Sequence, residues 1–151
     1  MIRLAEETFH GSEDPSAIVV TDVLMGRLRQ MHPSTVTEEL DEAGPIAWVL
    51  VLPTTSELLA RFIEKSITEK QLFESTPDKA SYTAVYLCSA LVLPEYRRKG
   101  IARRLIAAAV KSIRKDHPIS TLAFWPFSTE GRLLAESVAK ECGLPLFERP
   151  R

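Results

Sequence analysis

The most constraining feature of this chain is a junction at residues 92–104, where an apolar strand passes through a basic turn into an amphipathic helix. A helix start leaves backbone N–H groups without intrahelical acceptors, and the helix dipole adds partial positive charge there. Gly100 lets the backbone approach a ligand with no Cβ in the way. Five basic side chains raise the local potential, namely Arg97, Arg98, Lys99, Arg103 and Arg104. The pattern predicts a site for a phosphate-bearing ligand, and the alternative is a solvated helix start without a ligand.

The residues of this turn also match a family signature. The run Arg97-Arg98-Lys99-Gly100-Ile101-Ala102 resembles the R/Q-x-x-G-x-G/A signature of the GCN5-related N-acetyltransferase superfamily. A preceding strand, a following helix, a second strand near Leu122–Phe124 and a helix closing in Cys142-Gly143-Leu144 extend the likeness over about residues 80–147. The resemblance implies an α/β fold whose mixed, mainly antiparallel central sheet is flanked by helices. It also implies acetyl-CoA, or coenzyme A or another acyl-CoA, as the cofactor.

The same resemblance indicates which residues hold that cofactor. In the family, amides of the signature bind the pyrophosphate of acetyl-coenzyme A. The strand before the signature splays from its neighbour, so that the pantetheine arm lies between the two. The cofactor-binding candidates are therefore the strand end and the turn, namely Ala90, Leu91, Val92, Leu93, Arg98, Lys99, Gly100, Ile101, Ala102 and Arg103.

The catalytic residues are less clearly marked. Acyl transfer to an amine needs a neutral nucleophile, a donor to the oxyanion and an acid that protonates the leaving thiolate. Family members often supply the acid from a tyrosine, but Ala139 stands at the corresponding position here. We expect a replacement from Tyr86, the first choice, from Ser89 on the same strand, or from Glu136, which shares a helical face with Ala139. A core aromatic is the equally weighted alternative for Tyr86.

Composition narrows the class of protein. A chain of 151 residues with 45% hydrophobic content predicts one domain over residues 1–151. Nineteen basic and twenty acidic residues leave a net charge of −1, so no overall field favours nucleic acid or an anionic membrane. The N-terminus is too acidic for a signal peptide, and the apolar run Ile46–Leu52 is too short to span a bilayer. We therefore expect a cytoplasmic protein.

Metal binding is not expected. Cys88 and Cys142 are isolated from each other and from any histidine at a zinc-site spacing, which predicts buried thiols. His10, His32 and His117 are scattered, so we place them at loops and helix ends.

The first half of the chain predicts helices around one buried strand. A helix should open at Asp14-Pro15 and end near His32, before Pro33. The residues Thr35–Glu42 suit a short helix, and Ile46–Leu52 suits a strand buried on both faces and broken by Pro53.

A helical insertion should follow that strand. It consists of a helix capped within Thr54–Ser56 and a second piece at Thr68–Phe73. The family usually has a simple hairpin of strands at this point. The insertion either lines the acceptor site or only covers one face of the sheet, and the sequence favours neither.

The second half predicts the elements around the signature. The central strand is Tyr82–Leu93, a helix runs from Ile101 to about Asp116, and a strand spans Ile119–Phe124. Trp125-Pro126-Phe127 is interpreted as core. The last helix should begin at Ser128 or Thr129 and reach Cys142, with Gly143 just past its end.

The function predicted by the resemblance is direct transfer of an acetyl group from acetyl-CoA to a primary amine. The acceptor is open: a polyamine, a peptide terminus, a lysine side chain or a small-molecule amine. A non-catalytic acyl-CoA sensor or interaction module is the alternative, and a purely structural domain without a ligand is a third, disfavoured one. The chain ends soon after Leu146-Phe147, which leaves room for one more strand where the family commonly has two. We therefore expect an open sheet edge and a homodimer that completes the sheet.

Overall fold

The computed structural model describes residues 20–150, which form a five-stranded mixed sheet in the order β1-β2-β3-β4-β5. The β1–β2 and β2–β3 pairs are antiparallel, whereas the β3–β4 and β4–β5 pairs are parallel. The predicted α/β fold with a mixed sheet is confirmed. The strands are β1 (Val36–Asp41), β2 (Gly44–Thr54), β3 (Ala84–Val92), β4 (Thr121–Phe124) and β5 (Leu146–Glu148).

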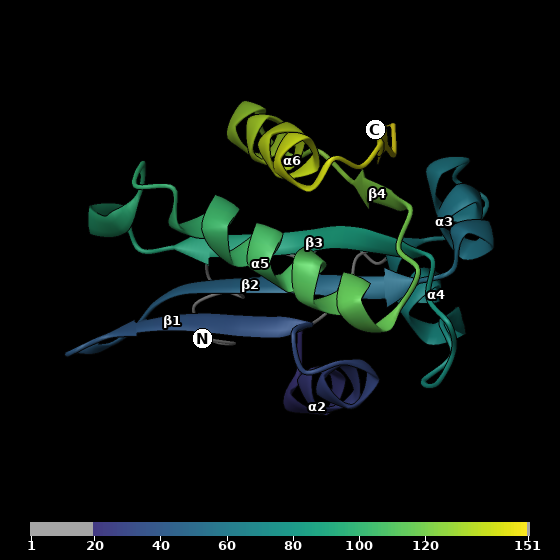
Figure 1. Cartoon of the computed structure of the whole chain (residues 1–151), viewed down its shortest axis with the longest axis horizontal. Coiled ribbons are helices and arrows are strands. Elements are labelled where there is room, and N and C mark those ends of the chain that lie inside the picture. Colours follow the sequence, from purple (N-terminus) through teal and green to yellow (C-terminus); the bar gives the residue numbers. More distant parts are fainter. Residues whose placement is uncertain (1–19, 151) are drawn as a thin grey trace.

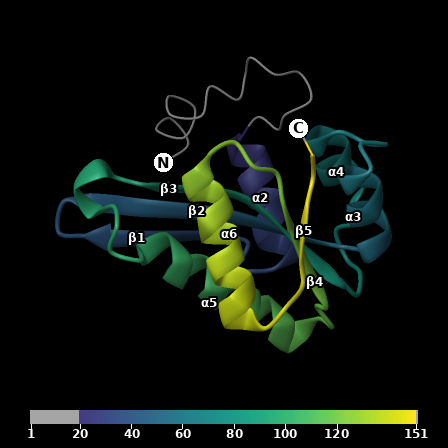
Figure 2. The same ribbon diagram turned by 90° about the horizontal axis from the view of Figure 1, so that it is seen from above.

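Helices cover the sheet, and two short helices lie beyond one end of it. The helix α5 crosses β2 and β3, and α6 packs beside α5 (Figure 1). The short helices α3 and α4 lie together past the end of β2, at the end of the sheet away from the basic turn (Figures 1 and 2). The helices are α2 (Asp22–Met31), α3 (Ser56–Ile63), α4 (Glu69–Ser75), α5 (Ile101–Asp116) and α6 (Thr129–Cys142), with a 3-10 turn η2 at Pro94–Tyr96.

The core is centred on β2. Every residue from Ala47 to Leu52 is 0% exposed, which confirms the predicted strand buried on both faces. The strand continues past Leu52, however, so the prediction that Pro53 breaks it is wrong. Pro53 pairs with Val85 of β3, and β1 has no residue opposite it. Because its missing N–H falls where β2 has only one neighbour, the proline costs the ladder no hydrogen bond.

The predicted short helix at Thr35–Glu42 is wrong, because this segment forms β1. Val36 is buried and pairs with Leu50. The Asp41 carboxylate then accepts hydrogen bonds from Ala43 N at 2.8 Å and Gly44 N at 3.2 Å, which closes a hairpin into β2. Pairing with the core strand outweighs the local helical preference of the glutamates.

The predicted first helix is too long. Thr21 has an extended backbone, and its hydroxyl caps α2 by accepting from Leu24 N at 3.1 Å, so the helix begins at Asp22. The predicted opening at Asp14-Pro15 lies outside the described residues, as does His10. The helix ends at Met31 with His32 as its C-cap, close to the predicted end near His32.

The two helices of the insertion are confirmed, with Thr55 as the cap of α3 and Thr68 in a capping box at α4. The last helix is confirmed as well, with Ser128 as its cap and Gly143 just past its end. The core interpretation of residues 125–127 is wrong at Phe127, which is 63% exposed, while Trp125 is half-buried.

Candidate functional site

The site begins where β3 parts from β4. The parallel ladder between them ends at the pair Leu87 and Phe124. On its other side, β3 carries Cys88 as an extra residue, because Leu50 pairs with Ser89 and Val51 pairs with Leu87. A bulge of this kind bends its strand. From residue 88 to 92, β3 has β2 on one side, and no strand among residues 20–150 pairs with its other side, a stretch of about 16 Å at the usual rise per residue.

The basic turn lies at the far end of that unpaired stretch (Figure 1). Arg98 has φ 64° and Gly100 has φ 75°, so the chain twice enters the left-handed region before α5 begins. The first bond of the helix runs from Arg104 N to Gly100 O at 3.0 Å. The amides of residues 101–103 precede that bond and have no intrahelical acceptor. This start of a 16-residue helix, preceded by a residue without Cβ, has the groups that an anion needs.

Other contacts fix the turn in place. Arg97 Nε donates to Val92 O at 3.0 Å, which ties the turn back to β3. Arg103 pairs with Glu141 of α6 at 2.9 Å, and Arg104 pairs with Glu39 of β1. Two of the five basic side chains are therefore partly neutralised, while Arg98 and Lys99 remain exposed.

The predicted cofactor residues fall into two groups along this path. Ala90, Leu91 and Val92 lie in β3 opposite Val49, Trp48 and Ala47, and Leu93 N donates to Ile46 O at 2.9 Å. The remaining six, Arg98, Lys99, Gly100, Ile101, Ala102 and Arg103, form the turn and the first residues of α5. The geometry is compatible with an extended ligand that has phosphates at one end, and the individual roles stay predictions.

Tyr86 is the most deeply placed of the predicted catalytic residues. It is 0% exposed, and its ring packs edge to face against Phe62 at 4.9 Å between centroids. Its hydroxyl donates to Glu69 Oε2 at 2.5 Å. Burial, and after it the Glu69 carboxylate, raises the pKa of the Tyr86 phenol well above its ordinary value. Tyr86 thus combines a core aromatic ring with a hydroxyl held protonated by a carboxylate.

The other candidates lie in different surroundings. Ser89 follows the bulge on β3, and its Oγ is buried. Glu136 is exposed on α6, where its carboxylate interacts electrostatically with Arg132. Ala139, on the same helix, is buried at 6% exposure and has no proton to give. The structure thus places Tyr86 and Ser89 near the strand separation and leaves Glu136 at the surface of α6.

Sequence reasoning missed Glu69 and Arg149. Glu69 opens α4 and is 5% exposed; an acidic residue in the first turn of a helix is ordinarily a solvated one, so its burial has no signal in the sequence. Arg149 is 7% exposed and follows β5. Its guanidinium lies 4.4 Å from the Phe62 ring centroid and 4.9 Å from that of Trp125. Only the tertiary structure brings these distant segments together.

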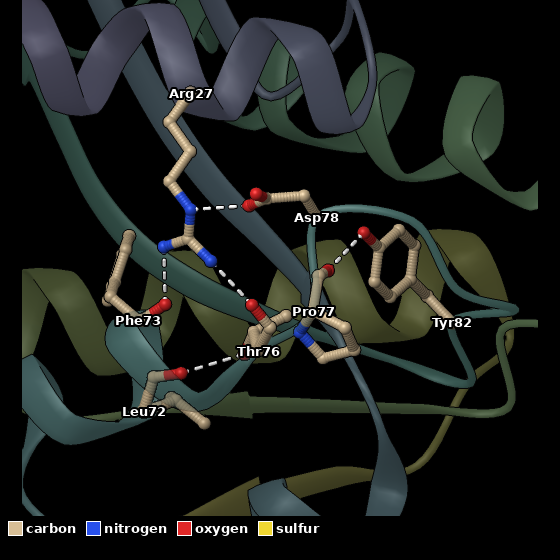
Figure 3. A network of polar contacts seen from close by, with 7 residues as sticks. All are labelled: Arg27, Leu72, Phe73, Thr76, Pro77, Asp78 and Tyr82. Atoms are coloured by element: carbon tan, nitrogen blue, oxygen red, sulfur yellow. Dashed lines mark hydrogen bonds and ion pairs between the residues drawn. The ribbon is translucent and has the colours of Figure 1, made fainter.

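Two arginines fasten the helical insertion to the rest of the fold. Arg149 Nη1 donates to Phe62 O at 2.9 Å and to Ile67 O at 2.7 Å, at the end of α3. Arg27, from α2, donates to Phe73 O and Thr76 O at the end of α4 and pairs with Asp78 at 2.6 Å (Figure 3). Cations suit helix C-termini because the free carbonyls carry partial negative charge. An arginine therefore holds the C-terminal end of each of the two inserted helices in place.

Two other kinds of feature are absent from residues 20–150. No group of three or more His, Cys, Asp or Glu side chains is placed to hold a metal ion. No helix in the same range is both long and apolar enough to cross a bilayer.

Comparison with solved structures shows a likeness in fold. The crystal structure of Chaetomium thermophilum Naa20 in complex with a bisubstrate analogue superposes with a TM-score of 0.52 at 16% sequence identity. The match covers 93% of this chain and 66% of that one, so the present chain spans slightly less than two thirds of its neighbour's length. No curated protein matches the sequence.

Comparison with family models gives a match to the Acetyltransferase (GNAT) family over residues 21–143. That range runs from the cap of α2 to the glycine after α6 and includes both the basic turn and the separated strands. The chain belongs to the GCN5-related N-acetyltransferase (GNAT) family.

Proposed function

We propose that this protein transfers an acetyl group from acetyl-CoA directly to a primary amine. The observation that carries the proposal is the unpaired edge of β3, which runs from the basic turn to the bulge at Cys88. An acyl-CoA has phosphates at one end, an extended arm and a thioester at the other end. The turn suits the phosphates, and the strand edge suits the arm. We assign the thioester to the region of the bulge, because Tyr86, whose hydroxyl donates to Glu69, lies two residues before Cys88 on the same strand.

In this proposal the chain's residues divide the work of binding. Amides of residues 98–103 hold the pyrophosphate, and Arg98 and Lys99 supply charge beside it. The backbone of residues 90–93 lies along the arm. When bound, acetyl-CoA supplies an activated acyl group on a thiol leaving group. Tyr86 then serves as the acid that protonates the leaving sulfur, with Ser89 and Glu136 as further candidates.

Direct transfer is favoured over an acylated cysteine. Cys88 is the thiol nearest the bulge, but burial, followed by the Glu69 carboxylate, raises its pKa well above the ordinary value; the Ser89 hydroxyl opposes this shift without reversing it. A thiol that stays protonated is a poor nucleophile. The solved neighbour was crystallised with a bisubstrate analogue, and a site that holds both substrates at once is what direct transfer requires.

The test is a calorimetric titration with acetyl-CoA and with coenzyme A, followed by a free-thiol assay. The assay uses separate pools of polyamines, peptides with a free N-terminus, lysine-containing blocked peptides and small aromatic amines. Binding followed by thiol release with one pool supports the proposal and identifies the acceptor class. Absence of binding contradicts the assignment of the turn.

A non-catalytic acyl-CoA sensor is the second candidate. It is favoured by Ala139, which is buried where the family often has its tyrosine acid, and by the complete burial of Tyr86. The same experiment separates the two functions, because a sensor binds acetyl-CoA and releases no thiol with any pool.

We also propose that two copies associate through the edge of β5. Phe147 on that strand is 47% exposed, and Leu133 on α6 is 58% exposed. An open strand edge with apolar neighbours is suited to pairing with another chain. Light scattering that shows a monomer at working concentration contradicts this part of the proposal.

A further inference from the structure

Glu69 holds a position that the proposed reaction has not used. Its Oε2 accepts the hydrogen bond from Tyr86 Oη at 2.5 Å and lies 3.9 Å from Cys88 Sγ. Tyr86 precedes Leu87, the last residue of β3 that pairs with β4, and Cys88 follows it. The carboxylate therefore lies at the point where the two strands separate.

The Glu69 carboxylate is largely removed from water, because the residue is 5% exposed. Removal of an ionised group from water is unfavourable unless hydrogen bonds and charges compensate it. An amide would keep a hydrogen bond to Tyr86 without the burial of a charge. The chain instead carries an acid on an inserted helix, and two arginine clamps hold that insertion in place. A rigidly held, buried carboxylate is an arrangement suited to proton transfer.

We propose that Glu69 is the general base of the acyl transfer and that Glu69 and Tyr86 form one proton relay from the acceptor amine to the leaving sulfur. The inference rests on the proposed function, since it assumes that acyl transfer takes place at the separated strands. It adds the base, assigns the helical insertion to the acceptor side and couples the base to the acid.

The relay moves one proton in a closed cycle. An acceptor that enters as an ammonium ion first gives a proton to water. As its nitrogen bonds to the carbonyl carbon, Glu69 accepts the second proton. As the bond between carbon and sulfur breaks, Tyr86 gives its hydroxyl proton to the sulfur, and the proton on Glu69 passes to the Tyr86 oxygen along the existing hydrogen bond. The amine and thioester become an amide and a thiol, and both residues return to their starting state.

The electrostatics of the pair couple the two transfers. The negative charge of Glu69 is one reason why the pKa of Tyr86 is raised, after burial. When Glu69 takes a proton, this charge is neutralised, and its hydroxyl can donate to the phenol oxygen. Tyr86 thereby becomes a stronger acid only after the amine has lost its proton. Within residues 20–150, Cys88 and Arg149 also act on the phenol, and the charge of Arg149 lowers its pKa.

The experiment compares wild type, Glu69→Gln, Tyr86→Phe and the double variant, with Glu74→Gln as the matched control. Glu74 is an exposed glutamate on the same helix. For each protein we would measure coenzyme A affinity by calorimetry, the unfolding transition in urea, and the rate of thiol release from acetyl-CoA with the active amine pool between about pH 6 and 9.

The relay predicts that Glu69→Gln and Tyr86→Phe each lower the rate by about 10²- to 10⁴-fold, while coenzyme A affinity stays within about threefold. The double variant should be hardly slower than either single one, because the two residues act as a unit. Wild type should lose activity at low pH as the proposed base becomes protonated, and Glu69→Gln should lack that decline beyond the titration of the amine itself. Glu74→Gln should match wild type.

Several outcomes overturn the inference. A folded Glu69→Gln variant that keeps the wild-type rate excludes the base, and a double variant whose loss equals the product of the single losses excludes the relay. If Glu69→Gln does not fold, Tyr86→Phe decides the question, and an unchanged rate in that variant rejects the proposal. A wild type that binds acetyl-CoA but releases no thiol with any pool removes the proposed function and this inference together.

Discussion

The basic turn and the Glu69–Tyr86 pair occupy the two ends of one strand, yet they are built in opposite ways. The turn is exposed and contiguous in sequence, and its charges come from residues 97–104. The pair is buried and brings together α4 and β3, with Arg149 after β5 as a third contributor. Phosphates are bound by amides and cations that can remain in contact with water. Proton transfer from a weak acid such as a phenol, in contrast, benefits when water is excluded. The contrast predicts that the two ends can be disabled separately.

The largest effect on coenzyme A binding is expected from Gly100→Val. A valine at φ 75° pays the left-handed backbone cost of about 1–2 kcal/mol and pushes a branched side chain into the anion cradle. We expect coenzyme A affinity to fall by more than about 100-fold, which corresponds to roughly 2.7 kcal/mol. Among residues 20–150, an added Cβ would meet Arg103 Nη2 alone, at 3.6 Å, so the fold itself should survive. Calorimetry measures the affinity, and urea unfolding measures the stability.

Gly143→Val is the control for that variant. Gly143 has φ 66°, and an added Cβ would meet nothing within 4 Å. It therefore carries the same backbone strain at the end of α6, away from the turn. If both variants lose the same stability and Gly143→Val keeps normal coenzyme A affinity, the binding defect of Gly100→Val arises at the turn. Equal affinity in both variants would contradict the cradle.

A change beside the buried Glu69–Tyr86 pair should lower stability and turnover and leave coenzyme A affinity nearly unchanged. Arg149→Met keeps a long apolar side chain but leaves the carbonyls of Phe62 and Ile67 without the donor that they share. We expect the free energy of unfolding to fall by about 3 kcal/mol and turnover to decrease, while coenzyme A affinity changes little. A parallel loss of affinity would show that the two ends are not separable.

The second clamp offers a sharper version of this comparison. Like Arg149, Arg27 donates to two carbonyls near a helix end. The Arg27 side chain is 27% exposed, however, whereas Arg149 as a residue is 7% exposed. Because water can replace part of its bonding, Arg27→Met should lower the free energy of unfolding by only about 1–2 kcal/mol. Urea unfolding of both variants under one condition measures the difference. A larger loss in Arg27→Met would mean that burial does not set the strength of these clamps.

The same contrast explains what could be predicted from the sequence. The turn could be identified because its glycine, its charges and its helix lie next to one another in the chain. The capped helices of the insertion and the apolar strand β2 were predictable for the same reason. Glu69 could not be identified, because its local pattern is that of any solvated helix start and its burial depends on β3. The segment at Thr35–Glu42 failed similarly, since pairing with β2 outweighs what its own residues prefer.

The smallest effect is expected where the turn meets the β1–β2 hairpin. Tyr96 donates to the Asp41 carboxylate, and this bond is the first reason why the pKa of Asp41 is lowered and that of Tyr96 raised. A lowered carboxyl pKa stabilises the fold above the ordinary Asp value and loses this effect as pH falls through the folded value. A raised phenol pKa stabilises it below the ordinary Tyr value and loses this effect as pH rises. The bond should therefore contribute evenly between about pH 5 and 9.

Tyr96→Phe tests that bond at the turn. The variant should be slightly less stable than wild type across this range, and the two proteins should converge in acid, where Asp41 becomes protonated. Urea unfolding at several pH values measures the difference, and calorimetry shows whether the hairpin contact also helps to hold the turn for coenzyme A. The ring contact with Lys99, whose ammonium lies 5.5 Å from the Tyr96 ring centroid, is kept in this variant. A stability difference that persists in strong acid would therefore mean that the Tyr96 hydroxyl acts through something other than the ionised Asp41 carboxylate.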